Sequence, residues 1–126
     1  MKIIIPINPI TKKNHSRLIN VHGRPMLIPS KPYVEFEKAC KPYMPTIDEP
    51  INYPINVKCL FYMKTRRKVD ISNLISAISD VLVKYKVIED DNRNIIASYD
   101  GSLVFYDKEY PHIEVEITKK ENYEQW

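Results

Sequence analysis

The residues best suited to chemistry are three aspartates that lie beside a run of positive charge or one helix length from it. Asp70 follows the cations of "RRKV", and Asp90 and Asp91 form a pair twenty residues later in "IEDDNRN". A hard divalent cation such as Mg²⁺ takes carboxylate ligands and keeps several waters. Metal-bound water attacks a phosphodiester more readily. These aspartates are therefore the candidate catalytic and metal-binding residues, with Mg²⁺ as the expected ion and Mn²⁺ as its alternative.

The cations near these aspartates are candidate contacts to a nucleic-acid backbone. They form one cluster early in the chain and another directly before Asp70. The predicted DNA-binding residues are Lys12, Lys13, Arg17, Arg66, Arg67 and Lys68. Such cations neutralise phosphates and would offset the repulsion between the carboxylates and DNA. The net charge of +3 does not by itself indicate this role, and a solvated positive surface is an equal alternative on charge alone.

Two further polar residues, Asn73 and Asp80, are expected to have structural or supporting roles. Asp80 lies ten residues after Asp70 on a predicted helix, which corresponds to a rise of about 15 Å. The two carboxylates of one helix therefore cannot share a metal ion. A salt bridge from Asp80 to Lys84 at i,i+4, or a structural hydrogen bond, is the expected alternative.

Each of the three aspartates could instead have a purely structural role. Asp70 could only cap a helix, and "EDDN" could only form a turn. A calcium-binding EF-hand loop starting at Asp90 is excluded, because its sixth residue should be glycine and is Ile95, and its twelfth should be glutamate and is Gly101. The two glycines form no phosphate-binding loop, so no nucleotide cofactor is expected.

The pattern of the chain predicts an α+β fold in one domain of residues 1–126, with a small mixed or mostly antiparallel sheet packed with about two helices. Strands are expected at "KIIIPI", at residues 55–63, and at "NIIASYDG", "SLVFYD" and "HIEVEIT", with a turn at Asp100-Gly101. Residues 9–31 form a long loop that could contain a hairpin around "NVHGRP". A first helix, "SKPYVEFEKACKPYM", begins at the capping residue Ser30 and ends or kinks at Pro42. The polar end, 118–126, is expected to fray.

The segment 71–85 is the strongest helix prediction, with Asp70 as its N-cap. The apolar stripe is expected to contain Ile71, Leu74, Ile75, Ile78, Leu82 and Tyr85. The opposite side is expected to contain Asn73, Ser76, Ala77, Asp80 and Lys84. This helix spans roughly 22 Å and separates Asp70 from Asp90 and Asp91. Either the chain folds back along the helix, or a second subunit supplies one set, as antiparallel helices in a two-fold dimer allow. Our hypothesis is a symmetric homodimer with sites at or near the interface.

Composition indicates a cytoplasmic protein. Cys40 and Cys59 lie in apolar surroundings without metal-ligand spacing, so they are expected to be buried reduced thiols. The apolar start is interrupted by Pro6 and Pro9 and is too short to span a membrane. Neither a membrane nor a secretory pathway is therefore expected to be involved.

The stretch "VDISNLISAISDVLVKYKVIEDDNRN", after its basic run, resembles the core of the RusA family of Holliday junction endonucleases. "NPITKKNHSR" and "YDGSLVFYDKEYPHIEVEI" resemble phage and prophage members of that family, which implies the cytoplasm of a bacterial host. The resemblance implies a homodimeric, Mg²⁺-dependent nuclease of α+β fold that cuts two symmetric strands of a four-way junction in DNA recombination and repair. It also implies catalytic roles for Asp70, Asp90 and Asp91.

Two positions depart from the family pattern. Ser72 stands where many members have a second aspartate, and Ser76 stands where many have a lysine. The runner-up function is therefore a non-catalytic protein of the same fold that binds junctions or other structured DNA. A general flap nuclease and an interaction protein with an acidic partner are the remaining alternatives.

Overall fold

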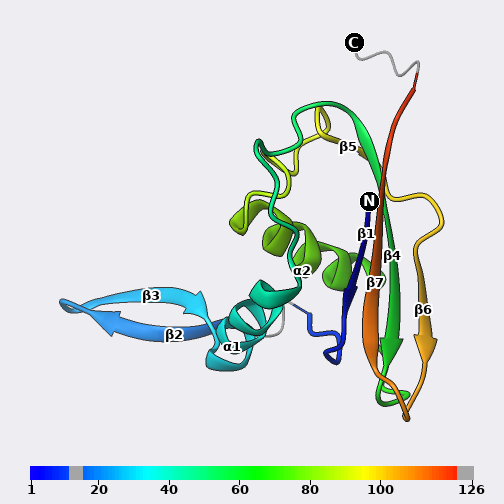
Figure 1. Cartoon of the computed structure of the whole chain (residues 1–126). Coiled ribbons are helices and arrows are strands. Elements are labelled where there is room, and N and C mark those ends of the chain that lie inside the picture. Colours follow the sequence, from blue (N-terminus) through cyan, green and yellow to red (C-terminus); the bar gives the residue numbers. More distant parts are fainter. Residues whose placement is uncertain (12–15, 122–126) are drawn as a thin grey trace.

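The polypeptide forms one layer of mixed β-sheet packed against two helices, with a separate β-hairpin that extends away from the sheet (Figure 1). This computed structural model describes residues 1–11 and 16–121. The elements are β1 (Lys2–Ile5), β2 (Ser16–Val21), β3 (Arg24–Pro29), α1 (Lys31–Cys40), the short 3-10 helix η1 (Lys41–Tyr43), β4 (Ile55–Met63), α2 (Ile71–Lys84), β5 (Ile96–Ser98), β6 (Leu103–Tyr106) and β7 (His112–Lys119). The predicted α+β fold is confirmed.

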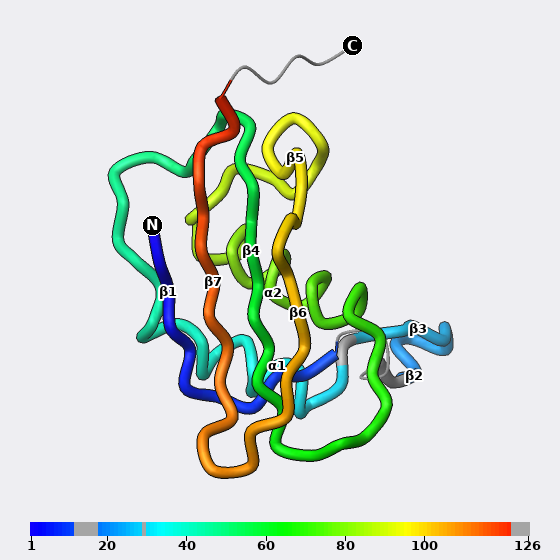
Figure 2. The backbone as a smooth tube through the Cα atoms, turned by 90° about the vertical axis from the view of Figure 1, so that its right-hand side faces the viewer, coloured from blue at the N-terminus to red at the C-terminus, as the bar shows by residue number. Residues whose placement is uncertain are grey.

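Strand β4 is the centre of the main sheet. One edge of β4 pairs antiparallel with β7, which in turn pairs antiparallel with β1. The other edge pairs in parallel with β5 at the start of β4 and with β6 at its end (Figure 2). This arrangement places segments from distant parts of the sequence at opposite ends of one strand.

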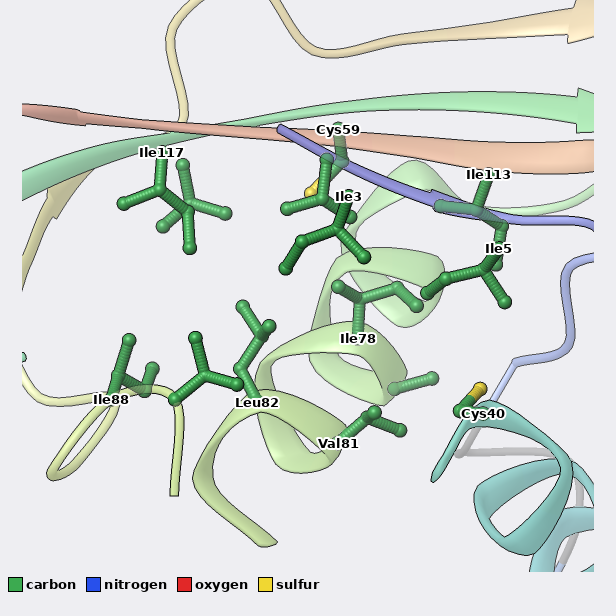
Figure 3. Close-up of a cluster of buried hydrophobic side chains, with 14 of the residues drawn as sticks. Ile3, Ile5, Cys40, Cys59, Ile78, Val81, Leu82, Ile88, Ile113 and Ile117 are labelled. Carbon is green, nitrogen blue, oxygen red and sulfur yellow. The ribbon is translucent and has the colours of Figure 1, made fainter. Parts of the chain in front are cut away.

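The alternation of apolar and polar residues determines which face of β4 is buried. The residues Ile55, Val57, Cys59, Phe61 and Met63 are at most 7% exposed, as the sequence predicts. They face the layer of α2, where side chains of the helix meet residues from β1 and β7 (Figure 3). The intervening residues of β4 are half-buried on the outer face. A two-residue period therefore produces one fully covered face.

Helix α2 is buried over a wider arc than the sequence predicts. Its buried residues are Leu74, Ala77, Ile78, Ser79, Val81 and Leu82. The placement of Ala77 on the polar side was wrong, because this side chain is 0% exposed, whereas the predicted stripe residue Ile71 is 37% exposed. The hydrophobic core contains residues of α1 as well as of the sheet, so α2 is enclosed on more than one side.

The smaller elements follow their local sequence signals. The predicted hairpin is present, and its turn uses positive φ angles at His22 and Gly23. Such a turn matches the twist of the two strands. Ser30 occupies the N-cap of α1, but its hydroxyl makes no capping hydrogen bond, and Pro42 lies in η1, where the α-helix has ended.

The two cysteines are confirmed as buried free thiols. Cys40 and Cys59 are both 0% exposed. Burial raises the pKa of each thiol to about 12, so both stay protonated and unreactive at neutral pH. Within the described residues no helix has the length and apolar character to cross a membrane.

We expect the substitution Leu82→Ala to lower the free energy of unfolding by about 2–5 kcal/mol, because it leaves a cavity between α2 and the sheet. Leu18→Ala is the matched control, since Leu18 is 70% exposed whereas Leu82 is 0% exposed. The control should change stability by less than about 0.5 kcal/mol in urea denaturation. Equal effects of the two substitutions would contradict the assignment of the core.

Candidate functional site

Asp70 lies at the start of α2, where the chain arrives from the end of β4. Its backbone carbonyl accepts hydrogen bonds from the N–H groups of Asn73 and Leu74 at 3.0 and 3.3 Å. Its side chain makes no capping hydrogen bond, so the predicted carboxylate cap is wrong. Instead, Asn73 Nδ2 donates to Asp70 Oδ2 at 3.3 Å. The Asn73 amide thus orients an exposed carboxylate that the helix backbone does not use.

Asp90 and Asp91 lie in a turn beyond the other end of α2. The chain reverses there, because the N–H groups of Val87 and Ile88 both donate to the carbonyl of Leu82. The Asp91 N–H donates to Asp90 Oδ1 at 2.6 Å. A second local bond, from the Asn94 N–H to Asn92 Oδ1, follows at 2.9 Å. The reversal returns the two exposed carboxylates toward the last turns of the helix.

Asp91 lies in a region of accumulated negative charge. Its pKa is raised above 3.8, first by desolvation, then by a hydrogen bond with the Asp90 side chain and by the charges of Asp80 and Asp90. The charge of Asp80 also contributes to the raised pKa values of Tyr33 and Tyr99. The structure therefore brings Asp80, Asp90 and Asp91 into electrostatic contact at one end of α2.

The structure adds a neighbour to the role expected for Asp80, because its charge acts on Asp91. Lys84 forms an ion pair with Glu37 of α1 at 3.4 Å. The rise of α2 separates Asp80 from Asp70, but the residues that follow the helix approach Asp80. The proximity to Asp91 depends on the chain reversal at Leu82, for which the sequence carried no clear signal.

Within one chain the two acidic groups lie at opposite ends of the fold. Asp70 follows the end of β4, whereas Ile55, at the start of β4, donates its N–H to the carbonyl of Ile95, shortly after Asp91, at 2.8 Å. The nine residues of β4 extend about 26 Å and the 14 residues of α2 about 21 Å, so each element separates the two acidic groups. Accordingly, residues 1–11 and 16–121 contain no group of three or more His, Cys, Asp or Glu side chains that could hold a metal ion.

The acidic residues fit a divalent metal in their chemistry, although one chain does not complete a site. Oxygen ligands suit Mg²⁺, and a cation beside Asp91 would offset the neighbouring charges that contribute to its raised pKa. The chain reversal after α2 brings Asp91 near Asp80, but within the described residues it does not gather Asp70, Asp90 and Asp91 into one metal-binding group.

The basic loop between β4 and α2 lies beside Asp70. Arg66, Arg67 and Lys68 are all exposed in it, and the Arg66 guanidinium lies 4.0 Å from the centre of the Tyr106 ring. Of the other predicted DNA-binding residues, Lys12 and Lys13 lie outside the described residues. The backbone of Arg17 belongs to β2, where it pairs with Ile28.

Comparison with known proteins identifies one family. A sequence model of the family described as "Endodeoxyribonuclease RusA" matches residues 6–118. The match begins directly after β1 and ends within β7, and it includes both acidic groups and the basic loop. No curated protein matches this sequence.

We expect Asp90→Asn to lower the pKa of Asp91, because it removes one neighbouring negative charge and keeps the Oδ1 acceptor for the Asp91 N–H. The pKa should stay above 3.8, since desolvation and the charge of Asp80 remain. Carboxyl ¹³C NMR titration measures it. The isosteric control is Asp107→Asn, at the other end of β4, which should leave the titration of Asp91 unchanged. No shift with Asp90→Asn, or an equal shift with the control, would show that the charges do not interact as described.

Proposed function

Because this chain belongs to the RusA family of Holliday junction endodeoxyribonucleases, we propose that it resolves four-way DNA junctions by paired, symmetric phosphodiester cleavage. Nucleases of this family generally depend on a divalent metal, and the ion proposed for this chain is Mg²⁺, with Mn²⁺ as its alternative. The reaction would serve DNA recombination and repair. The observation that carries the proposal is the placement of two exposed acidic groups at opposite ends of one helix, with a cationic loop beside one of them.

The separation of the acidic groups supports a homodimer with composite sites. In a two-fold dimer with antiparallel α2 helices, the start of one helix lies near the end of its partner. Asp70, held by Asn73, would then meet Asp90 and Asp91 of the other subunit. The two-fold axis produces two identical sites. A four-way junction likewise offers two equivalent strands, so the symmetry of the enzyme would match that of its substrate.

The roles of the individual residues follow from this arrangement. Asp70, Asp90 and Asp91 would hold Mg²⁺, and Asp80 would add negative charge behind them. The bound ion would supply an activated water and offset charge on the phosphodiester transition state. Asn73 would keep the Asp70 carboxylate in one orientation through the bond at 3.3 Å.

The cations of the basic loop would hold the DNA strand near Asp70. Arg66, Arg67 and Lys68 are exposed and precede it by two to four residues. Such side chains bind backbone phosphates, which positions the strand without reading its sequence. Lys12, Lys13 and Arg17 would extend the contact along the DNA.

A second candidate, a junction-binding protein without cleavage, is favoured only by Ser72 and Ser76. The two serines stand where many members of the family have an aspartate and a lysine. In this structure both are exposed, and the Ser76 hydroxyl donates to the Ser72 carbonyl at 2.9 Å. Neither side chain supplies a carboxylate or a cation. The nuclease remains the preferred function because the proposed catalytic set retains Asp70, Asp90 and Asp91.

We expect the wild-type protein to cut a synthetic four-way junction with Mg²⁺ and to leave it intact with EDTA. Asp70→Asn should reduce the cleavage rate by at least about 100-fold, because it removes a charged metal ligand. The same variant should still bind the junction in EDTA. Flap and duplex substrates, measured in parallel, distinguish a resolvase from a general structured-DNA nuclease. Tight junction binding without cleavage at any Mg²⁺ or Mn²⁺ concentration would identify the non-catalytic alternative.

Mixed dimers test the composite site directly. Two inactive variants, Asp70→Asn and Asp91→Asn, are co-expressed with different tags, and the heterodimer is isolated by two affinity steps. One of its two sites contains both substitutions, and the other retains every carboxylate. The heterodimer should therefore convert a supercoiled cruciform plasmid to nicked circles, although both parent homodimers are inactive.

The reciprocal heterodimer is the matched control. It combines a wild-type subunit with one that carries both Asp70→Asn and Asp91→Asn, so each composite site contains one substitution and no cleavage is expected. If each site were built within one subunit, the outcomes would be reversed. The first heterodimer would then be inactive and the reciprocal one would nick the plasmid.

A further inference from the structure

Two hollows flank the basic loop between β4 and α2. One, of about 340 Å³, lies between the loop and residues 8–11, and the other, of about 240 Å³, lies between the loop and β6. Met63, Thr65 and Arg67 line both hollows, which therefore lie side by side along the loop. We name the two hollows together the cation–aromatic groove, after Arg66, Arg67, Phe105 and Tyr106 in the half next to β6.

Strand β6 gives the groove an exposed aromatic wall. Strand β6 lies at the edge of the sheet, and its residues Val104, Phe105 and Tyr106 are 38%, 38% and 43% exposed. Exposed edge strands commonly carry charges that prevent association. A run of apolar and aromatic side chains at an edge therefore indicates a binding surface.

Alternation along β6 directs its two aromatic rings to opposite faces. Phe105 stacks on Tyr62 of the outer face, with ring centres 4.8 Å apart. Tyr106 lies on the face toward the basic loop, where the Arg66 guanidinium covers its ring at 4.0 Å. The ring of Tyr106 is thus available to a flat ligand that displaces Arg66.

The charge of the groove selects the class of ligand. Among the described residues that line it, two are arginines and none is acidic. The hydroxyl of Thr11, which is 3% exposed and lines the first hollow, has no hydrogen-bond partner in the described part of the chain. Cations suit phosphates, and an exposed aromatic ring suits the flat face of a base. The combination is that of a site for single-stranded nucleic acid.

We propose that the cation–aromatic groove binds an unpaired nucleotide at the branch point of the DNA junction. The base takes the place of the Arg66 guanidinium on the Tyr106 ring, and the freed guanidinium binds the phosphate of that nucleotide. Arg67 and Thr11 offer further polar contacts along the groove. The inference rests on the proposed function and deepens it, because a site for unpaired bases beside Asp70 recognises DNA structure rather than sequence.

The test compares DNA binding by Tyr106→Leu and wild type in EDTA, so that cleavage does not interfere. The probes are a four-way junction with two unpaired thymidines at its branch point and a duplex of equal length. Removal of the aromatic face should weaken binding of the junction about tenfold and binding of the duplex less than about twofold. Tyr106→Phe keeps the aromatic face and should retain wild-type affinity for both probes.

Tyr53→Leu is the matched control. Tyr53 is 41% exposed and has the Lys119 ammonium 5.2 Å from its ring centre, but it lies just before the start of β4, at the opposite end of the sheet from Tyr106. This substitution should leave binding of both probes unchanged. Equal losses with Tyr53→Leu and Tyr106→Leu, or no loss with Tyr106→Leu, would overturn the proposal.

A crosslink in the wild-type protein provides a test without any variant. A junction carrying 5-iododeoxyuridine at the branch point is irradiated, and mass spectrometry locates the modified residue. Attachment at Tyr106 supports the groove, and attachment only elsewhere overturns it. If Tyr106→Leu changes the oligomeric state in size-exclusion chromatography, the strand is a subunit contact and the proposal is wrong. A wild-type protein that binds no DNA at low salt removes the proposed function too, whereas DNA binding that is insensitive to Tyr106→Leu removes this inference alone.

Discussion

The fixed length of α2 is the constraint on which the rest of the structure depends. Six of its residues are buried, in contact with a core built from the sheet and α1, so the helix cannot shorten or bend without loss of packing. Asp70 precedes one end and Asp91 follows the other. This rigid element separates Asp70 from the chain reversal that carries Asp90 and Asp91, and on the proposed function a second subunit completes a site that uses both groups.

The charge at the second end of α2 opposes folding at neutral pH. Asp91 has a raised pKa in the folded protein, so its contribution to stability is present below its unfolded-state pKa and is lost as the pH rises through the folded-state value. The neighbouring charges of Asp80 and Asp90 add to this effect. A protein retains such a cluster at a net loss of stability unless another interaction compensates. On the proposed function, the compensating interaction is a bound divalent cation.

Local patterns in the sequence were sufficient to predict the main helices and strands, but not the contacts between them. The buried face of β4, the hairpin turn at Gly23 and the burial of Cys40 each depend on near neighbours in sequence, and all are confirmed. The burial of Ala77 could not be predicted, because a single apolar stripe assumes that only one side of the helix is covered. The contact of Arg66 with Tyr106 requires the parallel pairing of β4 with β6, which no local pattern specifies.

Ser72 and Ser76, the two departures from the family pattern, lie four residues apart on α2 and therefore share one face of the helix. An aspartate at 72 and a lysine at 76 would form an i,i+4 pair on one face of α2. Replacing both removes one negative and one positive charge, so the local net charge is unchanged, and a hydrogen bond from Ser76 to the Ser72 carbonyl occupies the same face. A charge-balanced change differs from the loss of one essential group. On the proposed function, Arg66 and Arg67, with the aromatic wall of β6 beside them, would supply contacts to DNA near Asp70.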